Sequence, residues 1–140
     1  MNIAITAADS KKELLARFCL AYKGVLAKHS IFCTSRTGRY IEEATGLDVV
    51  CFLSGPQGGY QQLASKIACN EVDLVIYLFD PLSNEKDNES SKYELNRLCD
   101  IYAIPLATNF STAEALVLGL DRGDLNWRIF VNPLFRKKTS

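Results

Sequence analysis

The sequence carries no net charge, and this absence narrows the possible partners. Its 140 residues include 16 Lys and Arg residues against 16 Asp and Glu residues. A protein whose main task is to hold a nucleic-acid backbone needs a basic surface. The balance therefore argues against nucleic acid as a partner, and the basic run Arg136-Lys137-Lys138 is too short to change this.

Long apolar runs are also lacking. No uncharged run approaches the length of a membrane span. Met1 leads directly into a strand pattern, with no basic segment followed by a long apolar stretch, which is the pattern of a signal peptide. We therefore expect no membrane partner and a soluble protein in the cytoplasm.

Patterns that bind metal or form disulfide frameworks are missing as well. The five cysteines are an odd number and form no Cys-x-x-Cys pair. Most lie among apolar neighbours, where cysteine packs as a small hydrophobic residue. The only histidine, His29, falls at the end of the first expected helix, away from the sheet edge where ligands bind. We expect no metal site.

What the sequence does contain is an alternation of strand and helix patterns. The run 72–79 is nearly continuous in apolar residues, as in parallel strands covered on both faces. Between residues 10 and 27, apolar residues recur every three or four positions, as on a helix face. Expected strands are 1–6, 31–33, 48–53, 72–79 and 105–108; expected helices are 10–27, 37–44, 60–69, 89–102 and 111–118.

This alternation predicts the fold class. It indicates a single doubly wound α/β domain over residues 1–140, with a mainly parallel five-stranded sheet flanked by helices. Residues 131–140 are expected to form a loose tail. Gly46 is placed to end one helix, and Ser111 with Glu114 forms a possible capping box for the last helix.

The topology limits where a ligand can bind, because open α/β sheets bind ligands outside the carboxyl ends of their strands. The clearest loop there is Ser54-Gly55-Pro56-Gln57-Gly58-Gly59. Its glycines allow close approach of the backbone, and free N–H groups of the next helix favour an anion. A tight turn that needs positive φ is the alternative. The loop is not a P-loop, since no lysine follows Gly59.

Two further turns at the same edge carry groups suited to phosphate. Thr34, Arg36 and Thr37 open one helix, where hydroxyl groups also serve as ordinary caps. Lys12 opens another beside Asp9, where a lysine can equally be solvated. Three such turns together predict a small phosphorylated metabolite or inorganic phosphate as the partner.

Six motifs from residue 3 to about residue 120 stand in the order and spacing of a known family, and through them the chain resembles the methylglyoxal synthases. The resemblance implies conversion of dihydroxyacetone phosphate to methylglyoxal and inorganic phosphate, no metal or organic cofactor, and a homohexamer. The motifs are Ala4-Ile5-Thr6-Ala7-Ala8-Asp9, Thr34-x-x-Thr37-Gly38, Ala44-Thr45-Gly46-Leu47, Ser54-Gly55-Pro56-x-Gly58-Gly59-x-Gln61-Gln62, Asp80-Pro81-Leu82 and Ile104-Pro105-Leu106-Ala107-Thr108-Asn109.

The resemblance also assigns a phosphate site. The residues that it implies for phosphate binding are Lys12, Thr34, Thr37, Ser54 and Gly55. Arg36 stands where the family usually has threonine and adds charge to this set. Arg136 is the nearest counterpart of a family arginine near the C-terminus.

The catalytic positions differ from the family pattern. Tyr60 replaces the aspartate that abstracts the substrate proton, and Ala8 replaces a histidine. Asp87 and Ser90 align with a histidine and an aspartate of the family. A tyrosine with a pKa near 10 is only about 0.1% ionised at pH 7. Tyr60 is therefore a poor replacement for the base.

Three functions remain open from the sequence. The first is a family member that binds phosphate or a small phosphate ester with weak or absent catalysis. The second is an active synthase whose acid and base groups have moved to Asp9, Asp80 or Asp87. A purely structural subunit that associates with an active homologue is a third reading.

Overall fold

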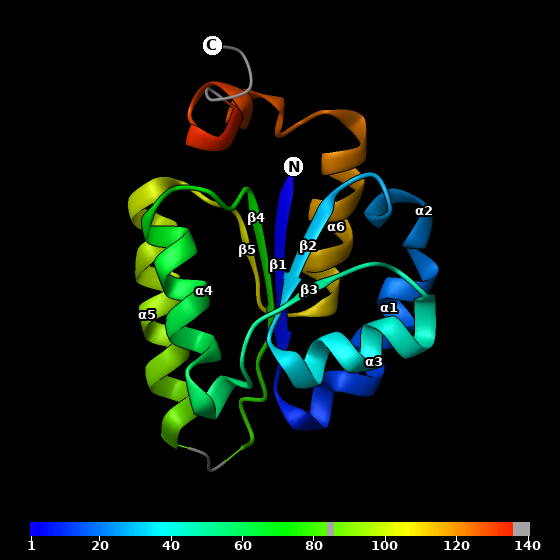
Figure 1. Ribbon diagram of the computed structural model, residues 1–140, viewed down its shortest axis with the longest axis vertical. Helices are drawn as coiled ribbons and strands as arrows, with labels where there is room; N and C mark the ends of the chain where they lie inside the picture. Colours follow the sequence, from blue (N-terminus) through cyan, green and yellow to red (C-terminus); the bar gives the residue numbers. More distant parts are fainter. Residues whose placement is uncertain (84–85, 136–140) are drawn as a thin grey trace.

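The computed structural model describes residues 1–83 and 86–135, with the side chains of residues 86–89 left out of the description. Its sheet is entirely parallel and has five strands in the order β3-β2-β1-β4-β5 (Figure 1). The predicted fold class is confirmed. The strands are β1 (Asn2–Ala7), β2 (Ser30–Cys33), β3 (Val50–Cys51), β4 (Leu74–Leu78) and β5 (Leu106–Ala107).

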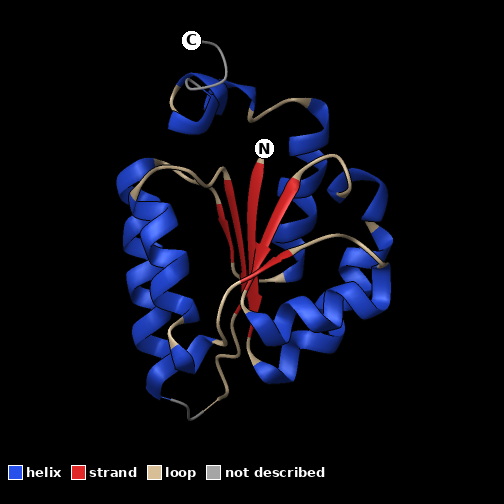
Figure 2. Cartoon of the chain, in the orientation of Figure 1, coloured by secondary structure: helices blue, strands red, loops and turns tan. Residues whose placement is uncertain are grey.

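Helices cover both faces of the sheet (Figure 2). One face carries α1 (Lys12–Ala21), α3 (Ser35–Thr45) and α6 (Phe110–Arg122), and the other carries α4 (Gly59–Ala68) and α5 (Lys86–Tyr102). The remaining short elements are α2 (Lys23–Leu26), η1 (Asp9–Lys11), η2 (Gly55–Gln57) and η3 (Asn126–Phe130).

The core follows the two-residue period of the strands. Along β4, Ile76 packs into the cluster under α1, α3 and α6, while Val75 packs against α4 and α5. Both side chains are fully buried, as expected for a strand covered on both faces.

Three local expectations were wrong. The single helix expected over 10–27 is divided into η1, α1 and α2, with a break at Tyr22. The third strand is only two residues long, because only Val50 and Cys51 pair with β2. The last helix is capped by Asn109, whose side chain accepts a hydrogen bond from the Thr112 amide, and not by Ser111. Gly46, in the left-handed conformation, ends α3 as expected.

A buried ion pair closes the amino end of the sheet. Arg128, on η3, donates to Asp73 at 3.1 Å, and both side chains are fully buried. Asn132, also fully buried, donates to the same carboxylate oxygen at 3.0 Å. The chain is therefore anchored at least as far as Asn132, which corrects the expectation of a loose tail from residue 131. His29 lies at this end too, with Nδ1 3.0 Å from the Met1 amine.

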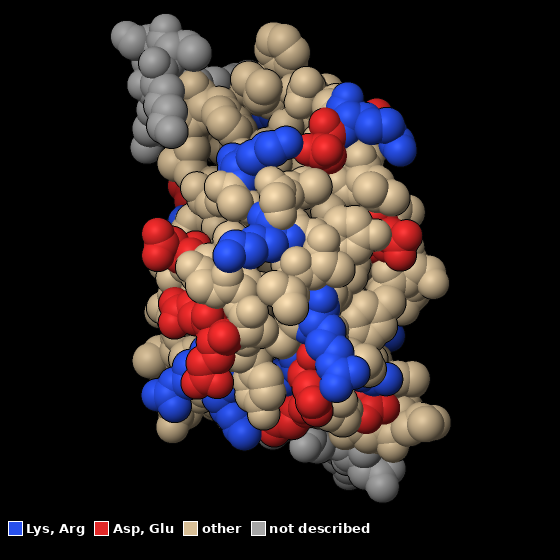
Figure 3. Space-filling view, turned by 90° about the vertical axis from the view of Figure 1, so that its right-hand side faces the viewer, with Lys and Arg blue, Asp and Glu red and all other residues tan. Residues whose placement is uncertain are grey.

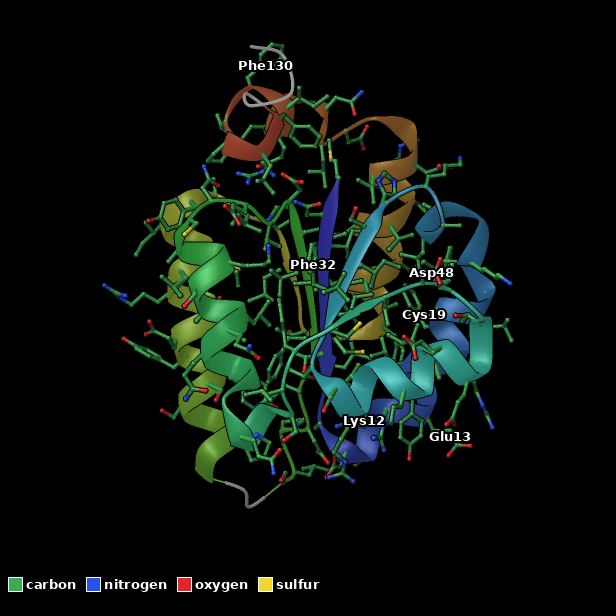
Figure 4. The ribbon with its side chains drawn as sticks, in the orientation of Figure 1. Lys12, Glu13, Cys19, Phe32, Asp48 and Phe130 are labelled. Carbon is green, nitrogen blue, oxygen red and sulfur yellow. The ribbon has the colours of Figure 1, made fainter. Side chains whose placement is uncertain are left out.

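The carboxyl ends of the strands lie at the opposite end of the molecule. Figure 4 places Lys12 there, at the lower end of α1, and Phe130 at the far end. Acidic and basic side chains are interspersed over the face shown in Figure 3. No helix among the described residues is both long and apolar enough to cross a membrane.

Candidate functional site

A small cavity of about 50 Å³ lies at the carboxyl ends of β1 and β2. The loops after β1, β2 and β3 all contribute to its wall, as the doubly wound topology requires. Of the predicted site residues, the cavity brings together four of the phosphate set and one catalytic candidate. The lining residues are Ala7, Ala8, Asp9, Lys12, Thr34, Arg36, Gly55, Pro56 and Tyr60.

Lys12 provides a buried positive charge at this cavity. Its side chain is 8% exposed, and Nζ donates at 2.7 Å both to the Ala7 carbonyl oxygen and to Asp9 Oδ1. An ammonium has three donors. These two bonds hold Lys12 in place and leave one N–H for an anion in the cavity.

Asp9 is held between two cations. Arg36 Nη1 donates to its second oxygen, Oδ2, at 3.2 Å. The hydrogen bond from Lys12 lowers the pKa of the Asp9 carboxyl below its ordinary value, and the charges of Lys12 and Arg36 lower it further, against an opposing effect of burial. Asp9 therefore stays ionised and is a weak base.

Buried hydroxyl groups form a chain below the cavity. The Oγ1 atoms of Thr6 and Thr34 are 2.8 Å apart, and Thr34 donates to Thr37 at 3.2 Å. Since Thr34 uses its hydrogen on Thr37, Thr6 is the donor to Thr34, and the Thr37 hydrogen is left for a further acceptor. Thr37 is fully buried and Thr34 nearly so. Both belong to the start of α3, whose first amides also favour an anion.

The glycine loop before α4 owes its shape to two residues. Gly58 has φ 113°, which side-chain-bearing residues rarely adopt. A Cβ on Gly59 would overlap the Leu53 carbonyl oxygen, so that only glycine fits this approach of two backbone segments. The turn folds Ser54 back, and its carbonyl oxygen accepts from the Gln57 and Gly59 amides at 3.0 and 2.9 Å. Gly55 is thereby brought to the cavity wall.

Tyr60, in the first turn of α4, fills the side of the cavity next to Gly55. The centre of its ring lies 5.9 Å from the centre of the Tyr77 ring. The Tyr77 ring stacks in turn on that of Phe79, with the ring centres 6.2 Å apart. On its far side, Tyr60 borders a hollow of about 170 Å³ that Ser90 also lines. The position that the resemblance assigns to the proton-abstracting aspartate thus holds a packed aromatic ring.

The other predicted residues are not all at the cavity. Asp80 is not among the lining residues, and its Oδ2 accepts from Ser10 at 2.6 Å and its Oδ1 from the Leu82 amide at 2.9 Å. These hydrogen bonds lower the pKa of Asp80, the Ser10 bond most of all. Ser54 adjoins the cavity only through Gly55. The Asp87 side chain and all of Arg136 lie outside the described residues.

Sequence reasoning missed two contributors. Thr6 stands at the end of a buried strand, where its hydroxyl fixes Thr34, and Ser10 fixes Asp80. The signal for Thr6 is a polar residue in an otherwise apolar strand. Nothing in the sequence marks Ser10, because its partner is 70 residues away.

The assembled groups suit anion binding better than proton abstraction. A buried ammonium, hydroxyl groups and the start of a helix lie at this cavity, and each of them favours an anion. The ionised carboxylates at hand, Asp9 and Asp80, have lowered pKa values, whereas a general base works best with a pKa near the operating pH. Within the described residues, no group of three His, Cys, Asp or Glu side chains is placed to hold a metal ion.

Comparisons with known proteins show which family the chain resembles. The family model of the MGS-like domain matches residues 17–108. The chain is 54% identical over 140 residues, 100% of its length and 99% of the relative's, to the methylglyoxal synthase of Caldicellulosiruptor saccharolyticus. It is 50% identical to that of Thermoanaerobacter sp. over 128 residues, 91% of this chain and 96% of the other.

A solved structure gives the same result. The crystal structure of methylglyoxal synthase from Elizabethkingia anophelis superposes with a TM-score of 0.77 at 38% identity, covering 83% of this chain and 76% of that one. Fold, family model and relatives over the full length agree, and the chain therefore belongs to the methylglyoxal synthase family.

Proposed function

We propose that this protein binds inorganic phosphate or a small phosphate ester of the dihydroxyacetone phosphate kind, and that it turns such an ester over weakly or not at all. The observation that carries the binding is the buried Lys12 ammonium, fixed at 2.7 Å to two oxygens with a third N–H left for an anion. Thr34, Thr37 and Gly55 complete the phosphate cradle, which we define as these residues with Lys12, Arg36 and Ser54.

Weak catalysis follows from the groups around the cavity. Methylglyoxal formation requires removal of a proton next to a carbonyl group. Tyr60 occupies the position that the resemblance gives to the base, and Ala8, which lines the cavity, carries no imidazole. One positioned acid or base contributes about 10²- to 10⁴-fold in rate, and stabilising the developing oxyanion contributes about 10²- to 10³-fold.

The second candidate is an active methylglyoxal synthase with relocated acid and base groups. The comparisons favour it over weak catalysis, because the relatives cited above carry that name at about half identity and nearly full coverage. Asp9, Asp80 and Asp87 are the carboxylates available for this role. Asp9 and Asp80 have lowered pKa values, which makes both of them weak bases.

One assay separates the two candidates. Purified protein is incubated with dihydroxyacetone phosphate, and the release of methylglyoxal and inorganic phosphate is measured. Turnover at least about 10⁴-fold below that of an active family member, measured in parallel, supports the first candidate. Turnover comparable with that member's, abolished by Asp87→Asn, establishes the second.

Binding is tested separately by thermal unfolding. Inorganic phosphate at about 100 times its Kd should stabilise the fold by about 2.7 kcal/mol. Lys12→Met should remove most of this gain. Lys28→Met is the matched control, because Lys28 pairs with Asp121 at the surface with its side chain 64% exposed. A melting temperature that phosphate and several of its esters leave unchanged would contradict the proposal.

The assembly and location remain predictions from the resemblance and the composition. We expect a homo-oligomer, a hexamer by family resemblance, in the cytoplasm. Light scattering on the purified protein tests the hexamer.

A further inference from the structure

A second and larger cavity, of about 350 Å³, opens at the carboxyl ends of β4 and β5. It shares no lining residue with the phosphate cradle. Its volume falls in the range of small-molecule sites, and its place at the carboxyl edge of a parallel sheet is where such folds bind ligands. Its lining residues are Lys11, Leu78, Phe79, Pro81, Lys92, Thr108, Asn109 and Phe110.

Part of the cavity lining is apolar. Leu78 is 2% exposed, and the half-buried rings of Phe79 and Phe110 form parts of the wall. Phe110 belongs to the core cluster on the α1 side, where it packs 6.0 Å from Phe18, and Phe79 belongs to the cluster under α4 and α5. Both rings are therefore held by the core, Phe110 on one face of the sheet and Phe79 on the other.

Two half-buried lysines give the wall its charge. The Lys92 ammonium lies 4.2 Å from the centre of the Phe79 ring, which holds its position at the cavity. Lys11 comes from η1, and its charge helps to lower the pKa of nearby Asp80. No carboxylate is among the lining residues, and among the described side chains no carboxylate oxygen lies within the 4.0 Å of an ion pair from either lysine.

Further hydrogen-bond donors lie on the same wall. Thr108 contributes its hydroxyl group, and Asn109 uses its side-chain oxygen to accept from Thr112, which leaves its NH₂ group as a donor. Asn109 also precedes the first turn of α6, a helix of 13 residues. Donors and cations thus share the lining with apolar side chains.

We propose that this cavity is a second ligand site, for a small organic anion with a flat apolar body, such as an aromatic carboxylate or an aryl phosphate. The apolar body contacts Leu78, Phe79 and Phe110, the apolar side chains of the lining. The anionic group is held by Lys92 and Lys11, and the Thr108 hydroxyl donates to it. The site is independent of the proposed function, since none of its residues belongs to the cradle.

The test uses NMR titration of the full chain with three probes, carried out once without and once with inorganic phosphate. The probes are 2-naphthoate, 2-naphthyl phosphate and the neutral 2-naphthalenemethanol. We expect saturable shifts of the Leu78, Thr108 and Phe110 amides with at least one anion, and at least about fivefold weaker binding of the alcohol. Preference between the two anions identifies the acid group.

Variants test whether Lys92 and Lys11 hold the anionic group. Lys92→Met should weaken binding of the preferred anion about fivefold or more. Lys66→Met is the matched control, because Lys66 lies over another ring, that of Phe32, at 4.5 Å, away from this cavity. Lys11→Met gives a second, independent loss.

Three outcomes of the titration overturn the proposal. These are equal binding of acid and alcohol, shifts confined to Thr34 and Gly55, or no saturable shift with either anion. Equal effects of Lys92→Met and Lys66→Met would also contradict it.

Discussion

The ring of Tyr60 lies directly over the α-carbon of Gly55, so closely that a Cβ at position 55 would overlap the ring atom Cε2. Gly55 begins η2, Tyr60 lies in the first turn of α4, and both line the cavity of the cradle. Gly55 is therefore constrained by contact, although its backbone is not in the left-handed region. The glycine and the tyrosine fit each other as a pair.

This contact predicts a strong coupling between the two positions. Gly55→Ala should lower the free energy of unfolding by about 1–3 kcal/mol, because the ring must move. In a Tyr60→Ala background, the same change should cost almost nothing. The measurement is a double-mutant cycle by urea unfolding.

Gly24→Ala is the control for this cycle, since a Cβ at Gly24 meets nothing within 4 Å. It should be neutral or stabilising, because alanine favours a helix. Equal costs of Gly55→Ala in both backgrounds would show that the ring is not the constraint.

The paired Asp9 carboxylate makes a pH-dependent contribution to stability. Its pKa is lower in the folded protein than its ordinary value, chiefly because Lys12 donates a hydrogen bond to it. Folding therefore favours the ionised form, and the stabilisation is complete above the ordinary carboxyl pKa near 4. It is lost as the pH falls through the lower, folded-state value.

Asp9→Asn should therefore destabilise the protein at pH 6 by about 1 kcal/mol, and the difference from wild type should shrink towards pH 3. Urea midpoints at both pH values measure this. Asp124→Asn is the control, because Asp124 is equally exposed, at 55%, but its partner Arg122 is itself exposed. A difference for Asp9→Asn that is constant with pH would contradict the explanation.

The buried pair at the other end of the sheet predicts a much larger effect. Arg128→Met leaves the Asp73 carboxylate buried without its cation and should cost about 3–5 kcal/mol in the free energy of unfolding. Arg122→Met breaks an ion pair whose arginine side chain is 67% exposed and should cost less than about 1 kcal/mol. Similar costs for the two variants would mean that Arg128 is not the anchor of the C-terminal segment.

The sequence predicted the sheet and its covering helices better than the helix cap and the contacts of the C-terminal segment. The nearly continuous apolar run of β4 predicted its place inside the sheet, and Leu74–Leu78 are all buried there. The sequence did not identify Asn109 as the N-cap of α6, because the spacing of Ser111 and Glu114 also fits a capping box. Arg128 and Asn132 were unpredictable, because their common partner Asp73 lies more than 50 residues away along the chain.

Several residues of the site were predictable from the fold. Lys12, Thr34 and Gly55 each follow a strand of a parallel sheet, so the topology alone brings them to one edge. The packing of Tyr60 on Gly55 and the low pKa of Asp80 depend on side-chain contacts that no spacing rule gives.

The last prediction concerns the missing base. Tyr60→Asp puts a carboxylate at the cavity wall and removes the ring that fills it, so formation of methylglyoxal and phosphate from dihydroxyacetone phosphate should rise above wild type. The gain should be partial, because Ala8 still lacks an imidazole to stabilise the enediolate oxygen. A triple variant that adds Asp87→His and Ser90→Asp should increase the rate further. Tyr93→Asp, a change at a tyrosine that is 73% exposed on α5, should leave the rate at the wild-type level. Phosphate release is measured for all four proteins under identical conditions. Strong turnover by the wild type that Tyr60→Asp abolishes would reverse this account and make Tyr60 itself a catalytic residue.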